Sequence, residues 1–82
     1  MSGADAELDY RGQRCPAPIV ALGRASRSTP GVVVELLADD PAAEFDVPAW
    51  CRLRGATLLS AVEAGGADTA TWRVFVIRLP EA

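Results

Sequence analysis

Two cysteines are the residues of this 82-residue chain best suited to chemistry. The chain has no histidine, which excludes Ser-His-Asp and Cys-His nucleophilic pairs. It has no glycine-rich phosphate loop, and its cysteines and carboxylates do not have the spacing of a zinc site. We therefore expect no metal and no organic cofactor, so that any reaction would run through a thiol.

Cys15 lies where a helix is expected to begin, in the stretch RCPAPIVALG. With Cys15 as the N-cap, Pro16 and Pro18 would occupy the first and third helical positions. Backbone N–H groups there have no partner within the helix, so proline removes them at little cost. The Ala17 N–H would then remain as the main free donor near the sulfur.

The same placement predicts an ionised sulfur at Cys15. A helix N-terminus carries partial positive charge, which favours thiolate over thiol. Arg11 and Arg14 would add to that potential if they point the same way. The alternative is a small buried cap residue, although Ser, Thr, Asp and Asn are the preferred N-caps.

The sequence context favours structural roles for Cys51 and for the Asp39-Asp40 pair. Cys51 lies in VPAWCRLRG, within a predicted helix, and a buried free cysteine behaves as a small hydrophobe. It could instead resolve a reaction at Cys15 or form a disulfide switch with it, and the sequence does not place the two sulfurs in space. Asp39 and Asp40 could be paired acid/base carboxylates, but before a helix they favour turn and capping roles.

The periodicity of apolar residues predicts the element order β-α-β-α-β-β. Proline and glycine punctuate these elements, and the loop signals of residues 65–70 predict a hairpin between the last two strands. The second helix should end at Gly55, with its best section capped by Asp46 and Pro48 in its first turn. The predicted strands are Glu7–Tyr10, Val32–Ala38, Thr57–Ala64 and Thr71–Leu79, and the helices are Pro16–Ser26 and Pro48–Arg54.

This order favours an α/β (α+β) two-layer sandwich, a four-stranded mixed sheet with two helices on one face. One domain over residues 7–82, preceded by a flexible segment 1–6, accounts for the length. The last strand alternates apolar and arginine side chains on both of its faces. The uncovered face should therefore either contact a partner or be shielded by arginine stems.

Composition and charge limit the partners and the location. The net charge is −3 and every cation is an arginine, so the chain lacks the basic stripe of a nucleic-acid-binding protein. No apolar run approaches the roughly 20 residues of a membrane span. The acidic N-terminus has no hydrophobic signal segment, which predicts a cytoplasmic protein with free thiols.

Three segments in order resemble the TusA/SirA-like sulfur-carrier family: LDYRGQRCPAP, LLADDPAAEFDVPAWCRLRG and the closing FVIR. The resemblance implies a fold similar to the C-terminal domain of translation initiation factor 3. It also implies that Cys15 carries sulfane sulfur as a persulfide, with Pro16 and Pro18 as the motif prolines.

Such a family member would be a persulfide carrier rather than a stand-alone enzyme. Its relay would serve tRNA thiolation, sulfur oxidation or cofactor sulfur supply. The donor would be a cysteine desulfurase or a rhodanese-like protein, and a second protein would accept the sulfur. We expect Arg11 and Arg14 to steer the anionic group and the Ala17 N–H to help hold it. The alternative is a regulatory module that docks on a transporter or enzyme through its sheet, with Cys15 incidental.

Overall fold

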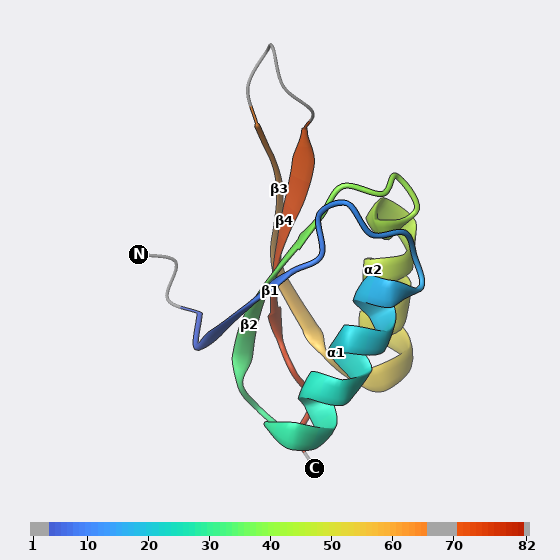
Figure 1. Ribbon diagram of the computed structural model, residues 1–82. Helices are drawn as coiled ribbons and strands as arrows, with labels where there is room; N and C mark the ends of the chain where they lie inside the picture. Colours follow the sequence, from blue (N-terminus) through green and yellow to red (C-terminus); the bar gives the residue numbers. More distant parts are fainter. Residues whose placement is uncertain (1–3, 66–70, 82) are drawn as a thin grey trace.

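A computed structural model describes residues 4–65 and 71–81 and shows two layers, a sheet and a pair of helices. Both helices lie on the same side of the sheet (Figure 1). This confirms the predicted fold class and element order. The elements are β1 (Ala6–Asp9), α1 (Ala17–Ser28), β2 (Val33–Ala38), α2 (Ala43–Arg54), β3 (Thr57–Ala64) and β4 (Trp72–Arg78).

The sheet has the order β1-β2-β4-β3, so the most apolar strands are central. β1 pairs with β2 in parallel, and β4 runs antiparallel to both β2 and β3. One register row joins Leu8 to Leu36 and Leu36 to Phe75 across three strands. The β3–β4 ladder shifts between Leu58 and Ser60, where Leu59 is the additional residue of a bulge. The hairpin is confirmed, although residues 66–70 of its predicted loop lie outside the described residues.

The core lies between the helix layer and one face of the sheet. Its largest fully buried side chains include Phe75, Leu22 and Leu36, each of which stabilises the fold by roughly 1.5–3 kcal/mol through burial. Ile19 and Ala25 of α1 pack against this cluster. The core cluster consists of Leu22, Val34, Leu36, Ala38, Ala43, Val47, Trp50, Cys51, Phe75, Ile77 and Leu79.

The prediction that α2 is best defined from Pro48 was wrong, because the helix begins at Ala43. Asp40 starts it: Asp40 Oδ1 accepts the Ala42 N–H at 2.8 Å, and the Asp40 carbonyl accepts the Ala43 N–H at 3.0 Å. Pro48 therefore lies inside the helix, and Asp46 lies in its first turns rather than at a cap. The helix ends as predicted at Gly55, whose φ of 75° is the left-handed conformation that favours glycine.

The open face of the sheet is partly apolar. Trp72, Val74 and Val76 are half-buried there, and Val62 is 55% exposed. The Arg11 guanidinium lies over the Trp72 ring, 4.7 Å from its centroid. Of the two expectations for this face, arginine shielding thus holds at Trp72, while Val62 remains exposed.

Candidate functional site

Cys15 lies in the loop between β1 and α1, at the end of the sheet where β2 gives way to α2. The thiol is free and its residue is partly buried, since the side chain packs against the edge of the core. The Cys15–Pro16 peptide bond is cis. The sulfur is thus neither covered by the core nor fully in solvent.

Asp39 and Asp40 fasten the loop that carries Cys15. Both carboxylate oxygens of Asp39 accept the Gly12 N–H at 2.9 Å. Asp40 Oδ2 accepts the Cys15 N–H at 3.2 Å, while Asp40 Oδ1 accepts the Ala42 N–H in the turn before α2. Gly12 has a φ of 85°, a conformation that suits glycine. The predicted turn role is confirmed for Asp40, but the predicted capping role is not, because the N-cap of α2 is Ala42 and no side chain caps it. The anchoring of the cysteine loop by both aspartates was not foreseen.

The start of α1 is displaced by one residue from the predicted register. Pro16, not Cys15, is the N-cap, which makes Ala17 the first helical residue and Pro18 the second. The Ala17 N–H donates to the Arg14 carbonyl at 2.9 Å, so it is not the free donor that we predicted. A turn between Arg14 and Ala17 precedes the helix. Cys15 lies within this turn, one residue before the N-cap.

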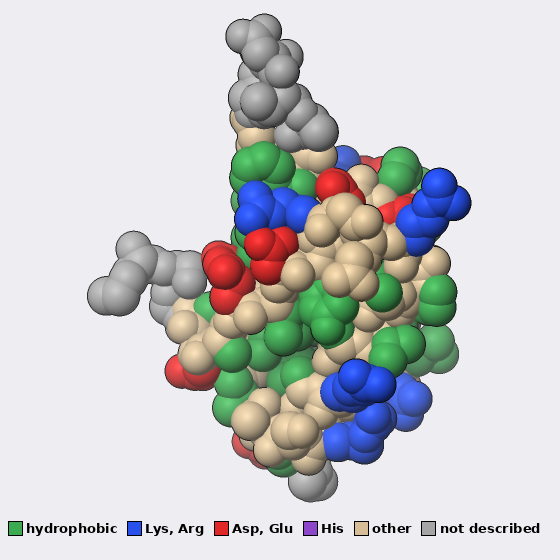
Figure 2. All heavy atoms as spheres, in the orientation of Figure 1, with side chains coloured by type: hydrophobic (Ala, Val, Ile, Leu, Met, Phe, Trp, Pro, Cys, Tyr) green, Lys and Arg blue, Asp and Glu red, His purple; other side chains and the backbone are tan. Residues whose placement is uncertain are grey.

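Arg11 does not supply the positive potential expected at Cys15. Its guanidinium pairs with the Asp9 carboxylate at 2.6 and 2.9 Å and stacks on Trp72. Arg11 in turn lowers the pKa of Asp9 to about 2 by hydrogen bonding. Arg14 is exposed and lines a shallow hollow with Pro16 and Arg24. Figure 2 shows further cationic side chains over the C-terminal part of α1, where Arg27 occupies the last turn.

The pKa of Cys15 is raised above its ordinary value, contrary to the predicted thiolate. Desolvation by burial is the largest cause, followed by the negative charges of Asp46 and Asp40 and by hydrogen bonding of the thiol with Asp46. The prediction failed because it counted the helix dipole and the neighbouring arginines, but neither the burial of the thiol nor the carboxylates of α2 and its preceding loop. Asp46 was read as a helix cap, so its position facing the start of α1 was missed.

Cys51 is a core residue, as predicted. It is 3% exposed and belongs to the same buried cluster as Val47 and Trp50. Desolvation raises its pKa, and the neighbouring Arg52 opposes that shift. Both cysteines are free thiols in the structure.

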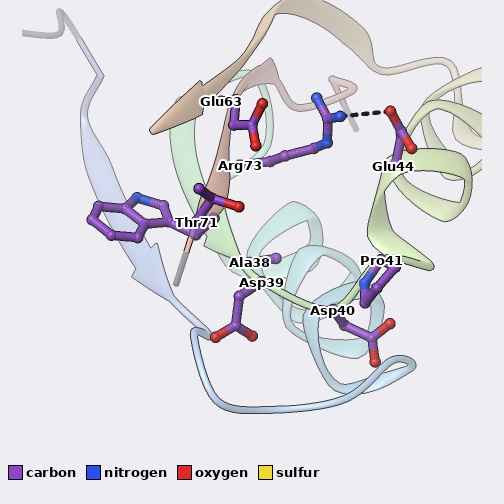
Figure 3. A pocket seen from close by; sticks show the side chains of 9 residues that line it. Ala38, Asp39, Asp40, Pro41, Glu44, Glu63, Thr71 and Arg73 are labelled. Carbon is purple, nitrogen blue, oxygen red and sulfur yellow. Dashed lines mark hydrogen bonds and ion pairs between the residues drawn. The ribbon is translucent and has the colours of Figure 1, made fainter. Parts of the chain in front are cut away.

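Four carboxylates are among the nine residues that line a hollow beside the cysteine loop. Figure 3 shows Asp39, Asp40, Glu44 and Glu63 around it, with Arg73 paired to Glu44 at 2.6 Å. Within residues 4–65 and 71–81, no group of three or more His, Cys, Asp or Glu residues is placed to hold a metal ion. In the same part of the chain, no helix is long and apolar enough to cross a membrane.

A comparison with protein-family models identifies the family of the chain. The model described as Sulfurtransferase TusA matches residues 6–78, from the first strand to the last. The match includes the cysteine loop, its two aspartate anchors and both helices. Membership implies a sulfur-carrier role between donor and acceptor proteins. Because the match covers most of the chain, the protein belongs to the TusA sulfurtransferase family.

Proposed function

We propose that this protein carries sulfane sulfur as a persulfide on Cys15. The observation that carries the proposal is a free, partly exposed thiol on a loop held by Asp39 and Asp40, within a family of sulfur carriers. Cys51 has the same chemistry but lies in the core, where a protein-sized donor has no access. Cys15 is therefore the sulfur-bearing residue of the proposal.

Loading exchanges one sulfur–sulfur bond for another. The Cys15 sulfur, after losing its proton to solvent, attacks the outer sulfur of a donor cysteine persulfide. The donor's S–S bond breaks, and its cysteine leaves as a thiolate that takes up a proton. Delivery repeats the exchange: an acceptor thiolate attacks the outer sulfur and releases Cys15. The overall exchange needs no oxidant and no metal.

The surroundings assign roles to the other predicted site residues. Pro16 and Pro18 fix the backbone at the entrance to α1. The Ala17 N–H closes a turn with the Arg14 carbonyl, so it is not free to bind the persulfide. Arg14 is the exposed cation beside Pro16 that would guide an anionic group, while Arg11 is engaged by Asp9.

The donor in this proposal is a cysteine desulfurase or a rhodanese-like protein. The acceptor belongs to a relay for tRNA thiolation, sulfur oxidation or cofactor sulfur supply. A cytoplasmic location fits the two free thiols, because reducing compartments keep cysteines unpaired.

The test is intact mass after incubation with a cysteine desulfurase and cysteine, or with a rhodanese and thiosulfate. We expect an adduct of about 32 Da, one sulfur atom, that dithiothreitol removes. Cys15→Ser should lose it. Cys51→Ala, the matched control, should keep it. An adduct that survives in Cys15→Ser, or none with either donor, would contradict the proposal.

A binding module remains the second candidate because Val62 is exposed beside half-buried Val74 on the open face of the sheet. Such a module would dock on a transporter or enzyme through that face. Val62→Asp would then abolish its biological effect, whereas Cys15→Ser would leave it intact. The carrier proposal expects the reverse order of effects.

A further inference from the structure

One face of α1 combines cationic and apolar side chains and runs away from the cysteine loop. A row at helical spacing of three or four residues consists of Ala17, Val20, Arg24 and Arg27. Its two arginines are exposed, and Val20 is 48% exposed. Arg14, also exposed, joins Val20 and Arg24 around a shallow hollow at the start of the row. Arg14 and this row together form what we call the α1 face.

The charge of the α1 face is opposite in sign to that of the chain. Residues 14–34 include three arginines and no acidic residue, whereas the whole chain has a net charge of −3. Within residues 4–65 and 71–81, both ion pairs lie elsewhere, at Asp9–Arg11 and Glu44–Arg73. Figure 2 shows cationic side chains over the C-terminal part of α1 with no acidic side chain among them. In the described part of the chain, no carboxylate neutralises the α1 face.

The length of the α1 face indicates the size of what it binds. A helix rises about 1.5 Å per residue, so Arg24 lies about 12 Å along α1 from Pro16, and Arg27 about 16 Å. Neither can touch a group as small as a persulfide on Cys15. A protein that brings its own sulfur to Cys15 must instead lie over the surrounding surface, and arginine is enriched at protein interfaces. The net negative charge of the chain disfavours a nucleic acid here.

We propose that the α1 face docks the protein that exchanges sulfur with Cys15, and that this partner presents carboxylates to it. The proposal rests on the proposed function, to which it adds a docking surface and the chemistry of the partner. Complementary charges steer the encounter and fix the orientation of the partner. Val20 supplies an apolar contact between the arginines, and Cys15 lies at the end of the face where the two sulfurs would meet.

The experiment offers Cys15 peptides of defined charge and uses no sulfur donor. Each peptide has one cysteine as a 2-thiopyridyl disulfide and four glutamates that begin four residues later, a reach of about 13 Å. The Cys15 thiolate attacks the peptide sulfur, a new disulfide forms, and the released thiopyridine takes up a proton and is measured by absorbance. A counterpart with four glutamines reports the reactivity of the thiol alone. All proteins carry Cys51→Ala, so that Cys15 is the only thiol.

The parent should react about 3- to 10-fold faster with the glutamate peptide than with the glutamine peptide at about 20 mM salt. This preference should disappear in about 0.5 M NaCl, because salt screens exposed charges. Arg24→Glu should abolish the preference and leave the rate with the glutamine peptide unchanged, whereas Arg24→Lys should retain it. Arg24 is substituted rather than Arg27, because Arg27 also complements the C-terminal end of α1.

Arg78→Glu is the matched control, because it changes the net charge equally at an exposed position of β4. It should keep the preference. An equal loss in Arg78→Glu would assign the effect to net charge and overturn the proposal, as would equal rates of the parent with both peptides. Circular dichroism checks the fold of Arg24→Glu, and Arg14→Glu, outside the helix, tests the same face if that variant unfolds. Binding of a single-stranded RNA probe that depends on Arg24 would assign the face to nucleic acid and also overturn the proposal.

Persulfide loading from a cysteine desulfurase and cysteine, or from a rhodanese and thiosulfate, separates this proposal from the proposed function. If the parent accepts sulfur but does not prefer the glutamate peptide, the docking role of the α1 face fails alone. If the parent prefers the glutamate peptide but accepts no sulfur from either donor, the carrier function fails while the preference of the α1 face for acidic partners stands.

Discussion

Cys15 and Cys51 are the same residue type in one small fold, yet they occupy opposite kinds of surroundings. Cys51 is almost fully buried within α2, among apolar side chains. Cys15 is partly exposed on a loop tied to the end of β2 by carboxylates. The pKa of each thiol is raised mainly by burial, but Asp46 and Asp40 raise that of Cys15 further. Exposure, rather than ease of ionisation, therefore separates Cys15, the proposed sulfur carrier, from the buried Cys51.

The largest difference should appear in alkylation of the native protein. Cys15 can meet iodoacetamide in the folded state, whereas Cys51 must wait for the structure to open. We expect Cys15 to react at least about 100-fold faster, because local opening of a core costs several kcal/mol. Peptide mapping after timed quenching measures both rates. In urea the rates should converge, and a fast Cys51 in the native state would contradict the comparison.

Substitution of Cys51 should destabilise the fold more than substitution of Cys15. Cys51→Ser places a hydroxyl in the apolar core and should lower the free energy of unfolding by about 1–3 kcal/mol. Cys15→Ser, at the partly exposed edge, should lower it by less than about 1 kcal/mol. Urea unfolding followed by tryptophan fluorescence measures both. Equal losses would mean that Cys15 carries core packing that its exposure does not indicate.

Salt should distinguish the causes that raise the pKa of Cys15. Charges at an exposed rim are screened when the Debye length falls from about 10 Å at 0.1 M to about 3 Å at 1 M salt. Desolvation is not screened. The midpoint of the Cys15 alkylation profile should therefore fall by a few tenths of a pH unit in 1 M NaCl and remain above the ordinary cysteine value. A midpoint that does not move would assign the whole effect to burial.

The smallest effect on the sulfur should come from Arg11→Ala. Because Arg11 binds Asp9, its loss should change the alkylation rate of Cys15 by less than about twofold. The pKa of Asp9 should instead rise from about 2 toward its ordinary 3.8, which NMR titration measures. Since the folded-state pKa is depressed, the pair stabilises the native protein above pH 4 and loses that contribution as the pH falls toward 2. A large change at Cys15 would instead support the positive potential at the thiol that the sequence suggested for Arg11.

Local patterns in the sequence predicted most of the fold. The periodicity of apolar residues predicted all six elements. The end of α2 was also predicted correctly, at Gly55, which has a positive φ. The start of α2 was missed because two signals competed for it. The prediction gave Pro48 the first-turn position that proline favours, whereas the turn formed by Asp40 leads into a helix that begins at Ala43. Packing of Ala43 and Val47 into the core supports a helix that includes an interior proline.

The site was less predictable than the fold, because its electrostatics depend on contacts between distant segments. The cysteine and its prolines were evident in the sequence. Asp40 and Asp46, however, reach Cys15 from 25 and 31 positions away, and only the tertiary structure brings these carboxylates to the thiol. Burial raises the pKa of Cys15 most and these carboxylates add to it, so a prediction from the immediate sequence neighbours had the wrong sign.

Two main-chain N–H groups of the loop around Cys15 are held by the aspartates that follow β2. Asp39 accepts a hydrogen bond from the Gly12 N–H, and Asp40 accepts one from the Cys15 N–H. The intervening Gln13 and Arg14 are exposed. Substitutions at these two outward positions can therefore remodel the surface that a visiting protein meets while the sulfur stays in place. Partner choice and sulfur placement are thus free to evolve separately in this small scaffold.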